Sequence, residues 1–363
     1  MFSNDRVKQG LTKIGLVLLT ILFVPVACVD DNTERNNTPL NIVSYGGYWQ
    51  EVIKQSMYIP YTEQTGISII EQTYDGSYGP LQEEYLYNTK KWDVVNVETN
   101  MVFQGESDDI TEAIDYSLVN TDDFIPEAIH SHGVGVMTWS WIMAYNKDLY
   151  AGNPPQSWVD FFDVERFPGS RGLQQDPRRV LEIALIADGV PVNQLYPIDV
   201  ERALAKLKKL NDDLLARNQQ LVWWNAYSRP AELLDSGSVT MTPGTNGRIL
   251  QAMKSGMTKI DYTWNGGIID LDWWVVMKKS QNKESSYDFI NFASSVEAQR
   301  EMSLMISYGP VNNAALASLP EDVRRTLPTY SDNLSKQFYF DTEWWGQNYD
   351  TIIERWNQWR NQL

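Results

Sequence analysis

Short apolar runs alternate with helical patterns along most of this chain, and that alternation restricts the fold more than any other feature. Leu40–Tyr45, Ile67–Gln72 and Trp92–Val97 are apolar enough to be buried strands. The segments between them, Tyr48–Gln64 and Pro80–Asn88, have helical spacing. Strands separated by helices are typical of parallel βαβ units. We therefore expect an α/β protein.

Two longer apolar stretches interrupt this pattern. Val134–Asn146 is a continuous strand pattern, and Asp261–Trp264 followed by Ile268–Met277 gives a second one. With 363 residues, the chain is long enough for two cores. We expect two lobes joined at these two crossings, which act as a hinge. The expected lobe 1 comprises 40–139 and 271–310, and the expected lobe 2 comprises 140–270 and 311–363.

The first residues have the pattern of an export signal. Basic residues precede Ile14–Ala27, an uncharged apolar run that is shorter than the ~20 residues of a membrane-spanning helix. We expect 1–27 to be a signal peptide. Small or short residues stand before Cys28, the single cysteine, as in a bacterial lipobox, so we expect Cys28 to carry lipid and 28–39 to be a flexible tether. The expected location is the periplasm or cell surface, with the protein anchored by lipid. The alternative is a plain secretory signal or a short membrane anchor, with Cys28 incidental.

Charge and motif content argue against several functions. The formal net charge of −17 repels nucleic acid, and no basic stripe offsets it. The only histidines, His130 and His132, have no third metal ligand at a suitable spacing, so we expect no metal and no cofactor. Nucleophile-elbow, zinc-protease and phosphate-loop motifs are absent. The acids Asp270 and Asp272 leave a secreted glycosidase as an alternative.

Acids and aromatic rings gather where the expected strands end. Tyr45 and Tyr48 follow the first strand, and Glu98 follows the third. Asp270 and Asp272 lie on the second crossing, next to two tryptophans. Ligands of such sheets bind beyond the carboxyl ends of the strands. An alkyl-ammonium ligand needs carboxylates for its charge and ring faces for its methylenes, so we expect a small amine ligand here.

Six stretches carry a family likeness. They are Ser44–Gln50, Trp92–Glu98, Arg171–Gly189, Asn246–Arg248, Gly267–Trp274 and Tyr308–Asn312. Together they resemble the spermidine/putrescine-binding family of bacterial ABC-transporter solute-binding proteins, from about Leu40 to the C-terminus. The resemblance implies a two-lobed, type II periplasmic-binding-protein-like fold. It also implies a monomer that delivers its ligand to a membrane permease and performs no chemistry.

The resemblance further implies which residues contact the ligand. The matching positions here are Tyr45, Tyr48, Glu98, Asp176, Asp270, Asp272 and Tyr308. Asp272 would grip the amine, and Asp270 stands where an aromatic ring is usual. Arg179 replaces a second acid that is common three residues after Asp176.

This replacement leaves two ligand classes open. A putrescine- or spermidine-class polyamine is the first expectation, because acids dominate the matched positions. An arginine can pair with a carboxylate through two hydrogen bonds, so a zwitterion such as γ-aminobutyrate is the alternative if Arg179 faces the ligand. If Arg179 instead faces outward and pairs with a surface acid, that alternative loses its basis. A sensor that presents the ligand to a membrane receptor is a further alternative to transport.

Overall fold

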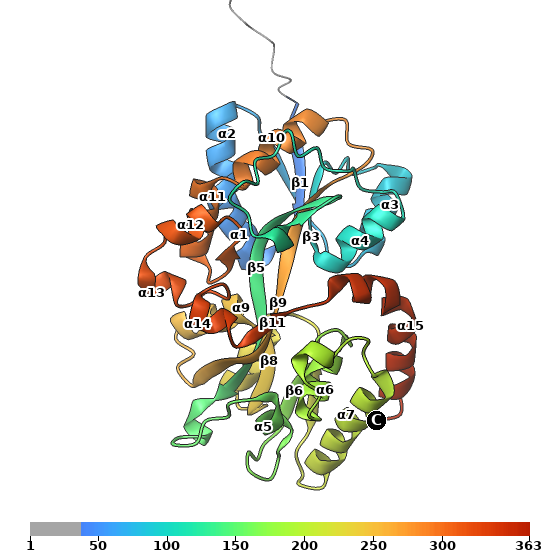
Figure 1. Cartoon of the computed structure of the whole chain (residues 1–363), viewed down its shortest axis with the longest axis vertical. Coiled ribbons are helices and arrows are strands. Elements are labelled where there is room, and N and C mark those ends of the chain that lie inside the picture. Colours follow the sequence, from blue (N-terminus) through green and yellow to red (C-terminus); the bar gives the residue numbers. More distant parts are fainter. Residues whose placement is uncertain (1–37) are drawn as a thin grey trace, which may run out of the picture. The chain divides into compact units, whose positions relative to one another are not determined.

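The computed structural model describes residues 38–363 (Figure 1). The expected signal peptide, Cys28 and most of the expected tether lie outside these residues. An 11-stranded sheet has the order β2-β1-β3-β9-β5-β8-β6-β7, with β4 and β10 paired to β5 and β11 paired to β9. The strands are β1 (Leu40–Ser44), β2 (Ile69–Thr73), β3 (Val94–Glu98), β4 (Ile129–His130), β5 (Gly133–Asn146), β6 (Arg171–Gln174), β7 (Leu221–Trp224), β8 (Met241–Thr245), β9 (Ile260–Val276), β10 (Gly309–Pro310) and β11 (Gln337–Tyr339).

Helices follow most of these strands. They are α1 (Gly47–Ile53), α2 (Ile59–Thr65), α3 (Gly79–Tyr87), α4 (Thr99–Ser107), α5 (Trp158–Phe162), α6 (Val180–Ala187), α7 (Val200–Leu215), α8 (Arg229–Asp235), α9 (Asn246–Lys254), α10 (Lys283–Ala293), α11 (Val296–Met305), α12 (Asn313–Ser318), α13 (Glu321–Arg324), α14 (Ser331–Leu334) and α15 (Thr342–Arg360). The short turns are η1 (Lys54–Tyr58), η2 (Pro126–Ala128), η3 (Lys147–Leu149) and η4 (Val192–Gln194).

The sheet is parallel at both ends and antiparallel in the middle. At one end β1 pairs in parallel with β2 and β3, and at the other β6 pairs in parallel with β7 and β8. The long strands β5 and β9 pair antiparallel with each other between the two ends (Figure 1). We call the β1–β3 end lobe 1 and the β6–β8 end lobe 2. The expected two-lobed α/β fold with two crossover segments is confirmed, whereas the residue boundaries of the lobes stay a prediction.

The first predicted helix is continuous but locally widened. The prediction of one helix over Tyr48–Gln64 corresponds to α1, η1 and α2, which follow one another without a break. The middle turn, η1, is a π-helical turn and ends just before Pro60. Proline has no backbone N–H to donate to the preceding turn, which favours a change in hydrogen-bond pattern there.

The second crossing is one strand rather than two pieces. Asn265-Gly266-Gly267 reads as a turn in the sequence, but β9 runs through it from Ile260 to Val276. Gly266 adopts a φ of 70°, which suits a residue without a side chain, and its carbonyl accepts the Trp158 Nε1–H at 2.7 Å. Pairing with β11 supports the same stretch. This continuity places Asp270 and Asp272 on the same rigid strand.

The C-terminal helix spans both lobes. Helix α15 packs against α4, which follows β3, and against α7 of lobe 2. Trp345 and Trp356 of α15 are fully buried. Burial of rings this large supplies much of the apolar stabilisation of a helix, so α15 is firmly held against the lobes it touches.

Candidate functional site

A cavity of about 550 Å³ lies where strands of both lobes end. Residues at or just after the ends of β1, β2 and β3 line it from lobe 1, and residues at or just after the ends of β6, β7 and β8 line it from lobe 2. Its polar lining residues include Tyr45, Asp75, Glu98, Gln174, Arg178, Tyr227, Arg248, Asp272 and Tyr308. This is the position that parallel βαβ topology favours for a ligand.

Asp272 has few partners for a buried acid. It lies on β9 directly opposite Glu98 of β3, and only 4% of its surface is exposed. Within residues 38–363 its carboxyl group accepts one side-chain hydrogen bond, from Trp139 Nε1 at 2.9 Å. Burial raises the pKa of Asp272 well above its usual range, and the nearby Glu98 raises it further. A buried carboxyl with one neutral partner is suited to receive a cation.

Within the described residues, the Glu98 carboxylate has three side-chain partners, all of which belong to lobe 2. Tyr227 donates its hydroxyl to Glu98 Oε1 at 2.7 Å. The other carboxylate oxygen lies 3.4 Å from Arg178 Nη1 and 3.5 Å from Arg179 Nη2. Because Glu98 ends β3 and its three partners belong to lobe 2, these contacts cross between the lobes.

Arg178 lines the cavity but directs most of its donors to neighbouring protein groups. It pairs with Asp176 through Nε to Oδ1 at 2.9 Å and Nη2 to Oδ2 at 3.0 Å. Its Nη1 donates to Asn100 Oδ1 at 2.6 Å. The guanidinium also stacks on the ring of Tyr349 of α15, 5.0 Å from the ring centroid, and Tyr349 Oη donates to Asp176 at 3.0 Å. Burial alone would raise the pKa of Asp176, but Arg178 outweighs it and lowers that pKa.

Arg179 lies outside the cavity lining and in the core. Its side chain is 1% exposed and forms an ion pair with Asp270, which is equally buried. The guanidinium lies between the rings of Trp139 and Phe340, at 4.5 and 4.9 Å from their centroids. Arg179 has a φ of 67°, which turns the chain just before α6. Asp270 is further held by Thr99 Oγ1 at 2.7 Å.

Arg248 lines the cavity but is not among the site residues expected from the sequence. It lies in the first turn of α9, half-buried, and lines the cavity beside Tyr308. In the described part of the chain no carboxylate lies within ion-pair distance of its guanidinium. Burial raises the pKa of Tyr308, and the Arg248 charge opposes that rise. The signal available in the sequence is its position in the stretch Asn246–Arg248, which carries the family likeness.

Aromatic rings form the remaining walls. Tyr45 stacks on Tyr74 with the ring centroids 5.4 Å apart, and Tyr308 meets Trp49 edge-on at 6.0 Å. Burial raises the pKa of Tyr45 well above its usual range, and Asp272 adds to this rise. Such rings offer flat faces to the methylenes of a small ligand.

The residues selected from the sequence therefore fall into two groups. Tyr45, Glu98, Asp272 and Tyr308 line the cavity. The remaining four are absent from its lining: Tyr48, Asp176, Arg179 and Asp270. Tyr48 donates its hydroxyl to the Met305 carbonyl of α11 at 3.0 Å.

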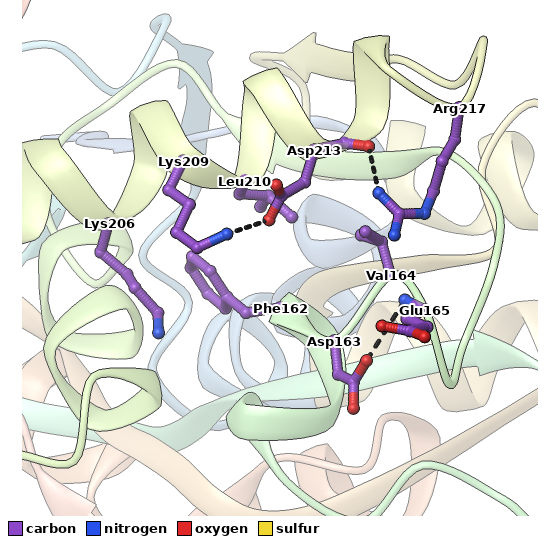
Figure 2. A pocket seen from close by; sticks show the side chains of 9 residues that line it. All are labelled: Phe162, Asp163, Val164, Glu165, Lys206, Lys209, Leu210, Asp213 and Arg217. Atoms are coloured by element: carbon purple, nitrogen blue, oxygen red, sulfur yellow. Dashed lines mark hydrogen bonds and ion pairs between the residues drawn. The ribbon is translucent and has the colours of Figure 1, made fainter.

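A second cavity of about 280 Å³ lies between α7 and the residues that follow α5 (Figure 2). Three of its charged residues contact one another. Lys209 Nζ lies 2.6 Å from Asp213 Oδ2, and Arg217 Nη1 donates to the Asp213 carbonyl at 3.0 Å.

The described residues give little support to other kinds of site. No group of three or more histidine, cysteine or acidic side chains in 38–363 is placed to hold a metal ion. His130 and His132 each approach Glu106, at 3.6 and 3.7 Å. Among the helices of these residues, none combines the length and apolar content needed to cross a bilayer.

Comparison with known proteins gives one consistent result. Residues 56–326 match the family described as bacterial extracellular solute-binding protein. The chain is 34% identical over 332 residues to the gamma-aminobutyric acid-binding protein of Pseudomonas aeruginosa, covering 90% of this chain and 92% of that one. It is 26% identical over 294 residues to the spermidine/putrescine-binding periplasmic protein of Escherichia coli, covering 78% and 82%. The crystal structure of an ABC transporter substrate-binding protein from Bradyrhizobium japonicum superposes with a TM-score of 0.83 at 29% identity, covering 89% of this chain and 99% of that one.

Proposed function

Because the chain belongs to the bacterial extracellular solute-binding protein family and is the solute-binding component of an ABC importer, we propose that it binds a small zwitterion of the γ-aminobutyrate class between its lobes. One observation carries this choice of ligand. Among the described residues, the cavity holds one buried carboxyl without a cationic partner at hydrogen-bond distance, Asp272, and one arginine without an acidic partner, Arg248. A ligand ammonium would pair with Asp272, and a ligand carboxylate with Arg248.

The other buried charges support this proposal because they pair among themselves. Asp176 is held by Arg178, and Asp270 by Arg179. Glu98 lies within 3.5 Å of a nitrogen of each arginine. A ligand with one positive and one negative end therefore matches Asp272 and Arg248, which have no oppositely charged partner at ion-pair distance within residues 38–363. The higher identity to the γ-aminobutyrate-binding relative than to the spermidine/putrescine-binding one points in the same direction.

A polyamine is the second candidate, and one observation favours it. Asp75 and Glu98 line the same cavity as Asp272, so three acids face it against two arginines. A diamine would place one ammonium at Asp272 and the other near Asp75 or Glu98. It would then bring a second positive charge beside Arg178, which already pairs with Glu98.

Titration calorimetry with four ligands of similar length tests the choice. The ligands are γ-aminobutyrate, butylamine, butyrate and putrescine. We expect γ-aminobutyrate to bind at least about 30-fold more tightly than either single-charge analogue, because each analogue leaves either Asp272 or Arg248 without its charged partner. Tightest binding by putrescine would favour the polyamine candidate. Binding of none of the four would contradict both candidates.

We also propose the cellular placement of the protein. Residues 1–27 would be removed as a signal peptide, Cys28 would carry lipid, and the monomeric protein would present its ligand to a permease without altering it. The composition of the N-terminal residues supports this, since an uncharged apolar run precedes a single cysteine and a polar stretch. Radiolabelled palmitate should enter the wild-type protein and not the Cys28→Ser variant. Equal labelling of the two would contradict the lipid anchor.

A further inference from the structure

Arg178 occupies a place in the binding cavity that a ligand cation could take. Its guanidinium lies between two acids from different lobes, Asp176 before α6 and Glu98 at the end of β3. The side chain lines the cavity and is 14% exposed, so it is largely buried. It forms an ion pair with each of these two acids.

We infer that Arg178 is an internal counter-ion that sets ligand specificity by denying Asp176 and Glu98 to a second ligand ammonium. This inference rests on the proposed function, because it explains how a cavity rich in acids selects a ligand with one ammonium. Specificity by exclusion needs a feature that disfavours the wrong ligand as well as one that holds the right ligand. Here the feature is a cation already present in the cavity.

The contacts of Arg178 show why it excludes diamines rather than binding the ligand carboxylate. Its Nε and Nη2 are engaged by Asp176, and its Nη1 by Asn100. The ring of Tyr349 covers one face of the guanidinium. A guanidinium fixed in this way has no free pair of parallel donors, which is the arrangement that a carboxylate prefers. Arg248 keeps its donors free of acids within the described residues and is the better carboxylate partner.

Removing Arg178 should therefore release binding capacity for a diamine. In the Arg178→Gln variant, Asp176 loses its two charged hydrogen bonds, and Glu98 keeps only Tyr227 and the more distant Arg179. A putrescine molecule could then place one ammonium at Asp272 and the other between Glu98 and Asp176. Pairing a buried carboxylate with a cation restores what the substitution removed.

The Arg248→Gln variant is the matched control. It removes the same positive charge from the same cavity but leaves Asp176 and Glu98 paired with Arg178. If diamine binding depended on net cavity charge alone, both variants would gain it equally. If it depends on the release of the two acids, only the Arg178 variant gains it. Arg178→Lys, which keeps a cation at the position, should resemble the wild type.

The experiment is calorimetric titration of the full-length purified protein and its variants with putrescine and with γ-aminobutyrate. We expect Arg178→Gln to bind putrescine at least about 30-fold more tightly than the wild type, as a charged hydrogen bond to a buried group predicts. Arg178→Lys and Arg248→Gln should gain less than about threefold, near the limit of a significant change. An equal gain in Arg178→Gln and Arg248→Gln, or no gain in either, would overturn the inference.

Two further results separate this inference from its premise. If the wild type fails to bind γ-aminobutyrate but Arg178→Gln still gains putrescine, the proposed ligand is wrong and the role of Arg178 stands. If circular dichroism shows that Arg178→Gln does not fold, the double variant Arg178→Gln/Asp176→Asn is titrated with putrescine instead, because it removes the unpaired Asp176 charge. A folded double variant should still gain about threefold to tenfold for putrescine through Glu98; no gain would again overturn the inference.

Discussion

Trp139 donates its indole Nε1–H to the Asp272 carboxyl at 2.9 Å, and within residues 38–363 no other side chain donates to that acid. The two residues lie on the paired long strands β5 and β9, so the rigid centre of the sheet fixes their geometry. The same strands connect the lobes. The acid that would meet the ligand ammonium is therefore held by the strands that connect the two lobes.

Replacing Asp272 with asparagine should abolish binding and stabilise the ligand-free protein. The pKa of Asp272 is higher in the folded than in the unfolded chain, so folding binds a proton and stability falls as pH rises through that raised pKa. Asparagine still accepts the Trp139 hydrogen bond and does not ionise. We expect Asp272→Asn to raise the free energy of unfolding by about 1–3 kcal/mol at pH 8, measured by urea denaturation. A variant less stable than the wild type at this pH would contradict the burial argument.

Ligand binding should expel a proton from Asp272. A ligand ammonium favours the ionised carboxylate and so lowers the pKa that burial has raised. Below that raised pKa, affinity should fall by up to about tenfold per pH unit, and above it affinity should be independent of this group. Calorimetry in two buffers with different ionisation enthalpies measures the proton released. The same heat in both buffers, at a pH below that raised pKa, would contradict the expected coupling.

Adding one methyl group at Gly247 should move Tyr308 out of the cavity wall. An ideal Cβ on Gly247 would lie 2.3 Å from a ring carbon of Tyr308, closer than real carbon atoms approach. We expect Gly247→Ala to weaken γ-aminobutyrate binding by about tenfold or more, because the ring must shift. Gly79 is the control, since a Cβ there meets no atom within 4 Å. Gly79→Ala should bind like the wild type; a matching loss of affinity would argue against the role of the ring.

Glu182 should matter to stability through its hydrogen bonds rather than its charge. This fully buried acid of α6 accepts from Tyr196 Oη at 2.8 Å and from Trp345 Nε1 of α15 at 2.6 Å, and burial raises its pKa. Glu182→Ala should cost about 2–4 kcal/mol of unfolding free energy, because two donors lose their acceptor and a cavity opens. Glu182→Gln keeps an acceptor and should cost much less. Equal losses in chemical denaturation would show that the charge itself is needed.

Much of the fold follows from local patterns in the sequence. The apolar run that starts at Leu40 forms β1, and the run at Val134–Asn146 forms β5 almost residue for residue. These segments are predictable because their apolar residues are continuous and end at polar residues or glycines. The run through Gly266 and Gly267 is less predictable, because contacts with residues distant in the sequence support it, namely pairing with β11 and the hydrogen bond from Trp158.

The two adjacent arginines show where sequence reasoning ends. Nothing in the local pattern distinguishes Arg178 from Arg179, and the family resemblance points to Arg179 as the residue that faces the ligand. Their directions are fixed by groups far away in the chain: Asn100 and Tyr349 hold Arg178 at the cavity, and Trp139 and Phe340 enclose Arg179 in the core. Arg248 was missed for the same reason, since only the folded chain brings α9 to the ends of the lobe 1 strands.

The measurement that tests the central claim most directly is a thermodynamic cycle of binding affinities, in which one change is made in the ligand and the other in the protein. γ-Aminobutyrate and butylamine differ by the carboxylate, and the wild type and Arg248→Gln differ by its proposed partner. We predict that Arg248→Gln lowers the affinity for γ-aminobutyrate to about that for butylamine, while butylamine affinity changes less than about threefold. If Arg248→Gln weakens both ligands by the same factor, or neither, Arg248 does not hold a ligand carboxylate and the zwitterion assignment is wrong.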